Sequence, residues 1–173
     1  MNRNLETFPL LISERLTLRR LSKNDSAAIL QLRSDTEINK FLDRKTSKTV
    51  EDALNFIDNI IENESEELLY WAITKTGEDR LIGTICLLDF LADLKKCEIG
   101  YELLMEYQGQ GIMIEAAKKV IEYAATKLEL KMIEALTHKE NCSSTKLLEK
   151  LNFKKLEDLM EDKPNLILFR LII

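Results

Sequence analysis

Two glycines stand close together, at positions 109 and 111, in a chain of 173 residues that has only five. Before this pair, Cys97–Met105 is predicted to be a strand, and after it Ile112–Lys127 carries apolar residues at helical spacing. A further strand is predicted at Met132–Thr137. The glycine pair therefore marks a β–α–β unit, whose two strands should run parallel and be joined by a right-handed crossover.

The rest of the chain adds strands and helices without a linker rich in Pro, Gly or Ser, so a single domain over residues 1–173 is expected. The other predicted strands are Arg15–Leu21, Leu69–Thr74, Leu81–Phe90, Lys154–Leu159 and Leu166–Ile172. The other predicted helices are Ser26–Ser34, Asp35–Leu42, a segment from the N-cap Thr49 to about Asn63, and Ser143–Leu151. This order predicts the α+β class, with a mixed, mostly antiparallel seven-stranded sheet flanked by helices.

Composition excludes several classes of function. The net charge of −5 lacks the overall basic excess that is usual for a nonspecific nucleic-acid binder. No apolar run approaches the roughly 20 residues of a membrane helix, and the N-terminal segment lacks the apolar core of a signal peptide. We therefore expect a cytoplasmic protein. Three cysteines without C-x-x-C spacing and a single histidine, His138, argue against a disulfide framework and a metal site.

The segment around the two glycines has the properties of an anion site. Glycine lets the backbone turn tightly, and the start of the following helix offers free N–H groups and the positive end of its dipole. A diphosphate is the natural ligand of such a loop, although a tight turn without a ligand has the same pattern. A P-loop is excluded because Gly111 is followed by Ile112-Met113. A dinucleotide fingerprint fails because Ile114 stands where its third glycine belongs.

With this loop, the sequence resembles the GNAT N-acetyltransferases, whose loop pattern is Gln/Arg-x-x-Gly-x-Gly/Ala. Gln108 and Gly111 fit that pattern, whereas Met113 replaces its small residue. Within the family, the chain is most similar to ribosomal-protein N-acetyltransferases of the RimJ/RimL type. Asn152 stands where that group has glycine after its last helix, and asparagine also tolerates the left-handed conformation. The resemblance covers Leu11–Ile172 and rests on four stretches in order: Leu11–Arg19, Glu98–Leu103, Gln108–Met113 and Asn141–Phe153.

The resemblance implies that acetyl-CoA is the co-substrate and lies where two strands separate. Its pyrophosphate would be held by a loop consisting of Gln108, Gly109, Gln110, Gly111, Ile112 and Met113. Its pantetheine arm would pair with the backbone of Leu103, Leu104 and Met105, with the Leu104 N–H polarising the acetyl carbonyl. Ser144 would protonate the departing sulfur, and Asn141 would contact the pantetheine in addition to capping a helix.

The general base has several candidates. Glu98 and Glu102 are four residues apart on one strand and so share a face. A carboxylate on a mostly buried central strand needs a partner or a function, and either residue could accept the proton of the amine through a water molecule. Glu134 and Glu161 are further candidates. Bulk water is the remaining alternative, because an α-amine with a pKa near 8 needs little help.

The leading function is therefore transfer of an acetyl group from acetyl-CoA to a primary amine by direct attack. The acceptor is either a protein N-terminus or a small amine, and Phe41–Thr49 is expected to form one wall of its cleft. A noncatalytic CoA-binding or sensor module on the same fold, and a purely structural domain, are the alternatives. No nucleic acid or membrane is expected as a partner, and the protein is expected to be a monomer or a homodimer.

Overall fold

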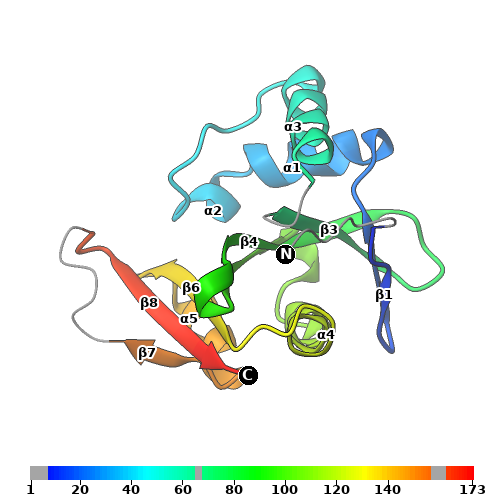
Figure 1. Ribbon diagram of the computed structural model, residues 1–173. Coiled ribbons are helices and arrows are strands. Elements are labelled where there is room, and N and C mark those ends of the chain that lie inside the picture. The colour runs from blue at the N-terminus through cyan, green and yellow to red at the C-terminus, as the bar shows by residue number, and fades with distance from the viewer. Residues whose placement is uncertain (1–7, 65–67, 157–162) are drawn as a thin grey trace.

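The computed structural model describes residues 8–64, 68–156 and 163–173. Its sheet has eight strands in the order β1-β2-β3-β4-β5-β6-β8-β7 (Figure 1). The strands are β1 Leu11–Ile12, β2 Leu16–Arg20, β3 Leu68–Lys75, β4 Leu81–Leu91, β5 Lys96–Leu103, β6 Met132–His138, β7 Lys154–Leu156 and β8 Leu166–Ile172. The helices are α1 Ser26–Ser34, α2 Thr36–Asn39, α3 Val50–Glu62, α4 Ile112–Thr126 and α5 Cys142–Lys150, with 3₁₀ turns at Lys23–Asp25, Ala92–Leu94 and Met105–Tyr107.

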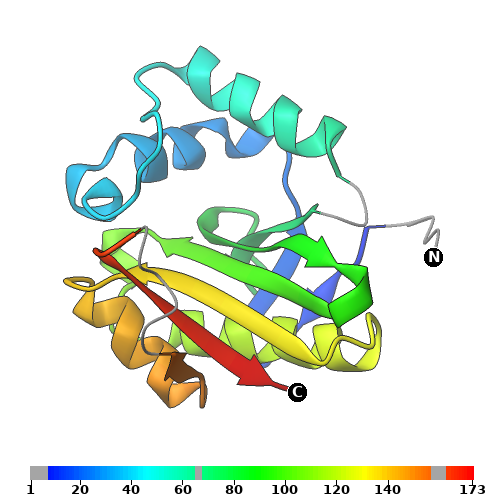
Figure 2. The same cartoon turned by 60° about the vertical axis from the view of Figure 1, so that its left-hand side comes forward.

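Helices cover the sheet on both faces. The layer of α1–α3 lies on one side and α4 with α5 on the other (Figures 1 and 2). Beneath α4, its small residues Ala116, Ala117 and Val120 pack in one core cluster with the fully buried Trp71 of β3. On the opposite face, apolar residues of α1 and α3 form a second cluster with Tyr70 and Leu104. The sheet is thus buried on both sides, as expected for a three-layer α+β domain.

The predicted fold class is confirmed, but the strand count is eight instead of seven. The additional strand is β1, where Leu11 pairs with Leu18 and Ile12 with Thr17. Ser13 turns the chain back by donating its N–H to the Leu16 carbonyl at 2.9 Å. A strand of two residues is too short to show alternation in a sequence. Of the predicted strand Lys154–Leu159, the structure shows β7 over Lys154–Leu156, and residues 157–159 of that prediction lie outside the described residues.

The parallel strands β5 and β6 separate soon after they begin. They pair only over Lys96–Glu98 and Met132–Glu134. Beyond this point β5 continues to Leu103 beside β4, while β6 continues to His138 beside β8. The sheet therefore opens between its two central strands, on the side toward the start of α4. This opening, which we call the strand gap, positions the site described below.

Candidate functional site

The loop before α4 has the glycine-dependent geometry that the sequence predicts. Gly109 and Gly111 have φ values of +73° and +76°, in the left-handed region that residues with a Cβ rarely adopt. A Cβ built on Gly109 would meet no atom within 4 Å. Both glycines are therefore required by backbone conformation, and the space in front of Gly109 is open.

The same loop presents a run of unused backbone donors. Within the described part of the chain, the N–H groups of residues 109–114 make no hydrogen bond, and the first bonded amide is that of Glu115, which donates to the Gly111 carbonyl at 3.1 Å. The side chains of Ile112 and Met113 point into the core, where they are 4% and 6% exposed. Met113 thus fills the core, while its backbone N–H remains free. Successive free N–H groups at a helix start make a cradle for an anion.

Glutamine side chains brace this cradle. Gln108 Nε2 donates to the Leu103 carbonyl at 3.0 Å, which fastens the loop to the end of β5. Gln110 Nε2 donates to the Glu106 carbonyl at 2.7 Å, within the turn that leads into the loop. Both glutamines belong to the loop that is expected to hold the pyrophosphate. Their side chains each bind a backbone carbonyl and so shape the loop, while the backbone N–H of Gln110 remains among the free donors.

The edge of β5 carries a second set of free donors. Residues of an antiparallel strand direct their N–H groups alternately to the two sides. The Leu104 N–H donates to the Ile82 carbonyl at 2.9 Å, so even-numbered residues here face β4. The N–H groups of Tyr101 and Leu103 consequently face the strand gap, beyond the last β6 partner at Glu98. The Leu104 N–H is therefore not available to polarise the acetyl carbonyl, because it already donates to β4, and the expected donor near Leu104 must be a neighbouring N–H.

The remaining predicted backbone contact is Met105. This residue begins the 3₁₀ turn after β5, and its side chain is 47% exposed at the rim of the site. It lies past the point where β5 faces the strand gap as a regular strand. Of the expected segment, Leu103 is thus the residue whose N–H faces the strand gap.

Ser144 and Asn141 lie together at the start of α5. The Asn141 Oδ1 accepts a hydrogen bond from the Ser144 N–H at 3.1 Å, which confirms its capping role. Ser144 Oγ lies 2.8 Å from the hydroxyl of Tyr101, a contact that joins α5 to β5 across the strand gap. Burial raises the pKa of Tyr101 to about 12, so its hydroxyl stays protonated. In the sequence analysis, Tyr101 belongs only to the stretch Glu98–Leu103, and no local pattern points to its contact with Ser144.

Thr137 carries an unused polar atom close to the same region. It lies on β6 beyond the last β5 pair, and its side chain points to the same face as Ala135 and the α4–α5 layer. The residue is 5% exposed, and its Oγ1 is the one buried side-chain nitrogen or oxygen among the described residues that has no hydrogen-bond partner. Buried hydroxyls normally have a partner, so this atom fits a ligand in the strand gap.

The two predicted strand carboxylates lie on the α1–α3 face, but in different surroundings. Glu102 is 9% exposed and forms an ion pair with Arg44 at 2.6 Å, while its other oxygen accepts from Thr84 at 3.3 Å. Glu98 is partly buried, and its carboxylate has no hydrogen bond or ion pair within the described chain. Burial, followed by the nearby charges of Asp89 and Glu134, raises the pKa of Glu98. Glu98 is therefore the free carboxylate, and Glu102 serves to hold Arg44.

The other carboxylate candidates are weaker. Glu134 is buried between Lys96 and Arg170, which both donate hydrogen bonds to it. Burial raises the pKa of Glu134, but the hydrogen bonds and charges of these two cations outweigh it and lower the pKa overall. Glu134 is thus an ion-paired structural residue. Glu161 lies outside the described residues.

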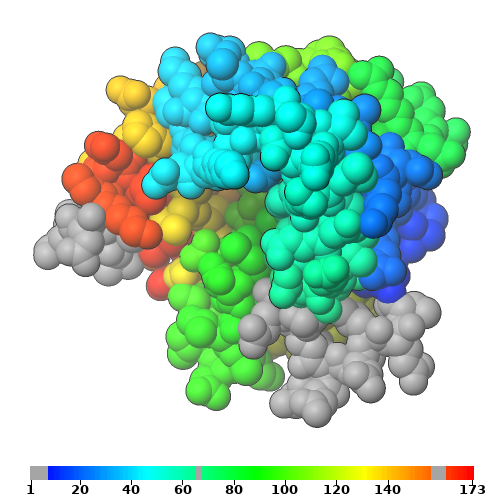
Figure 3. All heavy atoms as spheres, turned by 90° about the horizontal axis from the view of Figure 1, so that it is seen from above, coloured from blue at the N-terminus to red at the C-terminus, as the bar shows by residue number. Residues whose placement is uncertain are grey.

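On the α1–α3 face, the segment between α2 and α3 reaches over to β6. Phe41 stacks on His138 with ring centroids 5.2 Å apart and planes at 23°. Arg44, from the same segment, also donates to the Asn39 Oδ1 at 2.7 Å. Seen from above, the surface is hollowed between this helical layer and β8, and β6 lies at its floor (Figure 3). The segment Phe41–Thr49, which is expected to form one wall of the acceptor cleft, thus lies over the end of β6.

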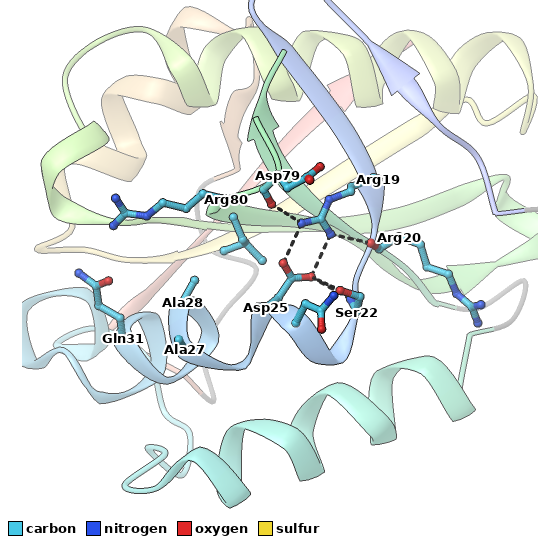
Figure 4. A pocket seen from close by; sticks show the side chains of 11 residues that line it. Arg19, Arg20, Ser22, Asp25, Ala27, Ala28, Gln31, Asp79 and Arg80 are labelled. Carbon is cyan, nitrogen blue, oxygen red and sulfur yellow. Dashed lines mark hydrogen bonds and ion pairs between the residues drawn. The ribbon is translucent and has the colours of Figure 1, made fainter. Parts of the chain in front are cut away.

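A second hollow, of about 630 Å³, lies between the end of β2, the start of α1 and the β3–β4 turn. An arginine and an aspartate in its wall form an ion pair. Arg19 pairs with the buried Asp25 at 2.7 Å and also donates to the Asp79 carbonyl (Figure 4). None of the candidate site residues lines it. In the described residues, no group of three His, Cys, Asp or Glu side chains is suited to hold a metal ion, and no helix is long and apolar enough to cross a bilayer.

Comparison with known proteins agrees with this geometry. The chain is 35% identical over 153 residues to the "Uncharacterized N-acetyltransferase p20" of Bacillus licheniformis, covering 88% of this chain and 85% of that protein. It is 30% identical over 149 residues to the "Uncharacterized N-acetyltransferase YoaA" of Bacillus subtilis, covering 86% and 84%. The fold matches that of RimL, a ribosomal L7/L12 α-N-protein acetyltransferase solved with coenzyme A, with a TM-score of 0.82, 17% identity, and coverage of 95% and 98%.

The family comparison covers most of the domain. Residues 15–154 match the family described as "Acetyltransferase (GNAT) domain". This span includes the strand gap, the loop before α4 and the start of α5. The protein is therefore an acetyltransferase of the GNAT family.

Proposed function

We propose that the protein transfers an acetyl group from acetyl-CoA to a primary amine. The observation that carries this proposal is the cradle of free N–H groups at residues 109–114, which lies at the open end of the strand gap. A diphosphate satisfies such a cradle, because its oxygens accept hydrogen bonds and its charge suits the helix dipole. CoA is the ligand that carries both a diphosphate and an arm long enough to follow the gap.

The strand gap then holds the arm of the co-substrate. The N–H groups of Tyr101 and Leu103 pair with carbonyl oxygens of the pantetheine and the thioester, as a neighbouring strand would. Thr137 Oγ1 supplies a further hydrogen bond from the β6 side. The Tyr101 N–H is placed to stabilise the oxyanion that forms when the carbonyl is attacked. RimL, solved with coenzyme A, shares this fold.

The amine approaches from the opposite face. The acceptor cleft lies on the α1–α3 side, where Glu98 is the free carboxylate. Glu98 accepts the proton of the attacking amine through a water molecule, and the amine nitrogen then bonds to the carbonyl carbon. The carbon–sulfur bond breaks, and Ser144 gives its hydroxyl proton to the thiolate and takes a proton back from solvent, while the Tyr101 hydroxyl, 2.8 Å away, positions it and stays protonated. The products are the N-acetyl amine and CoA, and the enzyme contributes mainly positioning.

The acceptor class is either the α-amino group of a protein N-terminus or a small amine. RimL modifies the N-terminus of a ribosomal protein, which supports the first. In this chain, the Phe41–His138 stack and the Arg44–Glu102 pair set the wall of the cleft. A free carboxylate facing this cleft favours a cationic acceptor of either kind.

A thermal shift with millimolar acetyl-CoA is the first test. A ligand present at about 100 times its Kd adds about 2.7 kcal/mol of stability, so a clear rise in Tm is expected. Thiol release is then measured against N-terminal peptides and small amines. Ser144→Ala should lower turnover at saturating substrate. Tight binding of CoA without thiol release on any amine would support the noncatalytic sensor instead, and absence of binding would overturn the proposal.

A further inference from the structure

We propose that Arg15 positions the diphosphate cradle by cancelling the charge of Glu115 and by fixing the Gln110 carbonyl. This inference rests on the proposed function, because the diphosphate is that of acetyl-CoA. It assigns a role to a residue that is far in the sequence from the loop that it serves. Sequence patterns give no sign of it, since Arg15 is separated from Glu115 by 100 residues.

The negative charge of Glu115 opposes the binding of a diphosphate beside it. Its carboxylate lies in the first turn of α4, directly after the free N–H groups of residues 109–114. An acidic residue there suits the helix dipole, but it also repels a bound diphosphate. Burial raises the pKa of Glu115, yet hydrogen bonds from Arg15 and Ser13 and the charge of Arg15 bring it below its usual value. Glu115 is therefore ionised beside the place where another anion must bind.

The turn between β1 and β2 neutralises this carboxylate. Glu115 Oε1 accepts hydrogen bonds from the Arg15 N–H and from Ser13 Oγ, each at 2.8 Å. Its Oε2 accepts from Arg15 Nε at 2.6 Å. Both oxygens are thus occupied by donors from one short turn. The side chain of Glu115 is 19% exposed and that of Arg15 is 51% exposed, so the carboxylate is partly shielded while the guanidinium stays accessible to a ligand.

The rest of the Arg15 guanidinium is turned toward the loop. Nη1 donates to the Gln110 carbonyl at 3.2 Å, which holds this carbonyl away from the incoming phosphate oxygens. Nη2 makes no hydrogen bond to the described chain, and a Cβ built on Gly111 would lie 3.6 Å from it. A free guanidinium N–H at this position can donate directly to a phosphate oxygen. Arginine suits this double task because its fork presents several fixed donors.

A double-mutant experiment separates this role from a merely structural one. The variants are R15Q, E115Q and R15Q/E115Q, and the measurements are the Kd for CoA and the Tm without ligand. R15Q should raise the Kd for CoA about tenfold, because it leaves the Glu115 charge unopposed. The double variant should recover the part of this loss that comes from the unopposed Glu115 charge, and the part that remains measures the lost contacts of the guanidinium with the loop. R15K, which keeps the charge but not the fork, should fall between wild type and R15Q.

The matched control is R80Q. Arg80 forms an exposed pair with Glu106 at 3.1 Å, also beside the turn that leads into the loop. R80Q should leave the Kd for CoA unchanged. Equal weakening by R15Q and R80Q would overturn the role of Arg15, and R15Q and the double variant binding CoA equally weakly would overturn the cancelling of the Glu115 charge. If R15Q fails to fold, the E115Q variant alone decides, since it should bind CoA at least as tightly as wild type. Wild-type protein that does not bind CoA refutes the proposed function itself.

Discussion

At the scale of single residues, the hydroxyl of Thr137 should lower the stability of the protein without ligand and strengthen its binding of CoA. Its buried hydroxyl has no partner, which costs about 1–3 kcal/mol in the protein without ligand. Thr137→Val removes the hydroxyl at nearly constant shape. We expect a higher Tm without ligand and a several-fold weaker Kd for CoA, measured by thermal melting and calorimetry. Thr137→Ser should keep the binding. A lower Tm together with an unchanged Kd would contradict the role of this hydroxyl.

Glu98 gives a prediction about pH. Its pKa in the folded protein is raised, so the native state binds protons more readily than the unfolded chain. Stability therefore falls as the pH rises through the ordinary pKa of glutamate, near 4.3, and through the raised value above it. Glu98→Gln should be more stable than wild type at pH 7, and the difference should vanish below about pH 4. Urea unfolding at several pH values measures this.

The same substitution tests the chemistry. Glu98→Gln should remove the acid limb from the pH profile of kcat/KM, while the Kd for CoA stays unchanged. An acid limb that persists in this variant would move the base to another group or to water.

At the scale of elements, the sequence indicated most of what forms the site. The glycine pair, the helix after it and the strand before it occur where the periodicity predicts them, because these patterns are local. Asn152, which stands where the resemblance expects glycine, has a φ of +65° at the end of α5. Asparagine tolerates this left-handed conformation, so it can replace glycine there. Sequence patterns could not predict which groups bond to one another across the fold. Which side the N–H of Leu104 faces depends on β4, and the partner of Tyr101 comes from α5.

The loop offers a prediction with an internal control. Gly111→Val forces a branched residue into φ +76° and places its side chain beside the free N–H groups. Gly77, in the β3–β4 turn, has a similar φ of +82°, and a Cβ built there would meet no atom within 4 Å, whereas one at Gly111 would lie 3.6 Å from Arg15 Nη2. Both variants should lose about 1 kcal/mol or more of stability. Only Gly111→Val should weaken CoA binding, as measured by calorimetry. Equal affinity in the two variants would exclude the loop as the diphosphate site.

At the scale of the whole molecule, one ion pair joins the segment between α2 and α3 to the sheet. Arg44 and Glu102 are 21% and 7% exposed, and they link the α2–α3 segment to β5. Removing one partner leaves the other charge buried, so Arg44→Met should cost about 3–5 kcal/mol. Arg44→Met/Glu102→Gln should recover much of this. Urea unfolding of the single and double variants tests the coupling, and a single variant with less than about 1 kcal/mol of loss would contradict it.

The strand gap also bears on how the molecule holds together. Strands β1–β5 and strands β6–β8 share one hydrophobic core, but their strand pairing is limited to Lys96–Glu98 with Met132–Glu134. Under the proposed function, a bound pantetheine would add backbone hydrogen bonds where β5 and β6 do not pair. Ligand binding would thus complete the sheet and couple its two parts more tightly. When CoA binds, amide hydrogen exchange should accordingly slow most at Tyr101 and Leu103, because these N–H groups then bond to the ligand instead of to water.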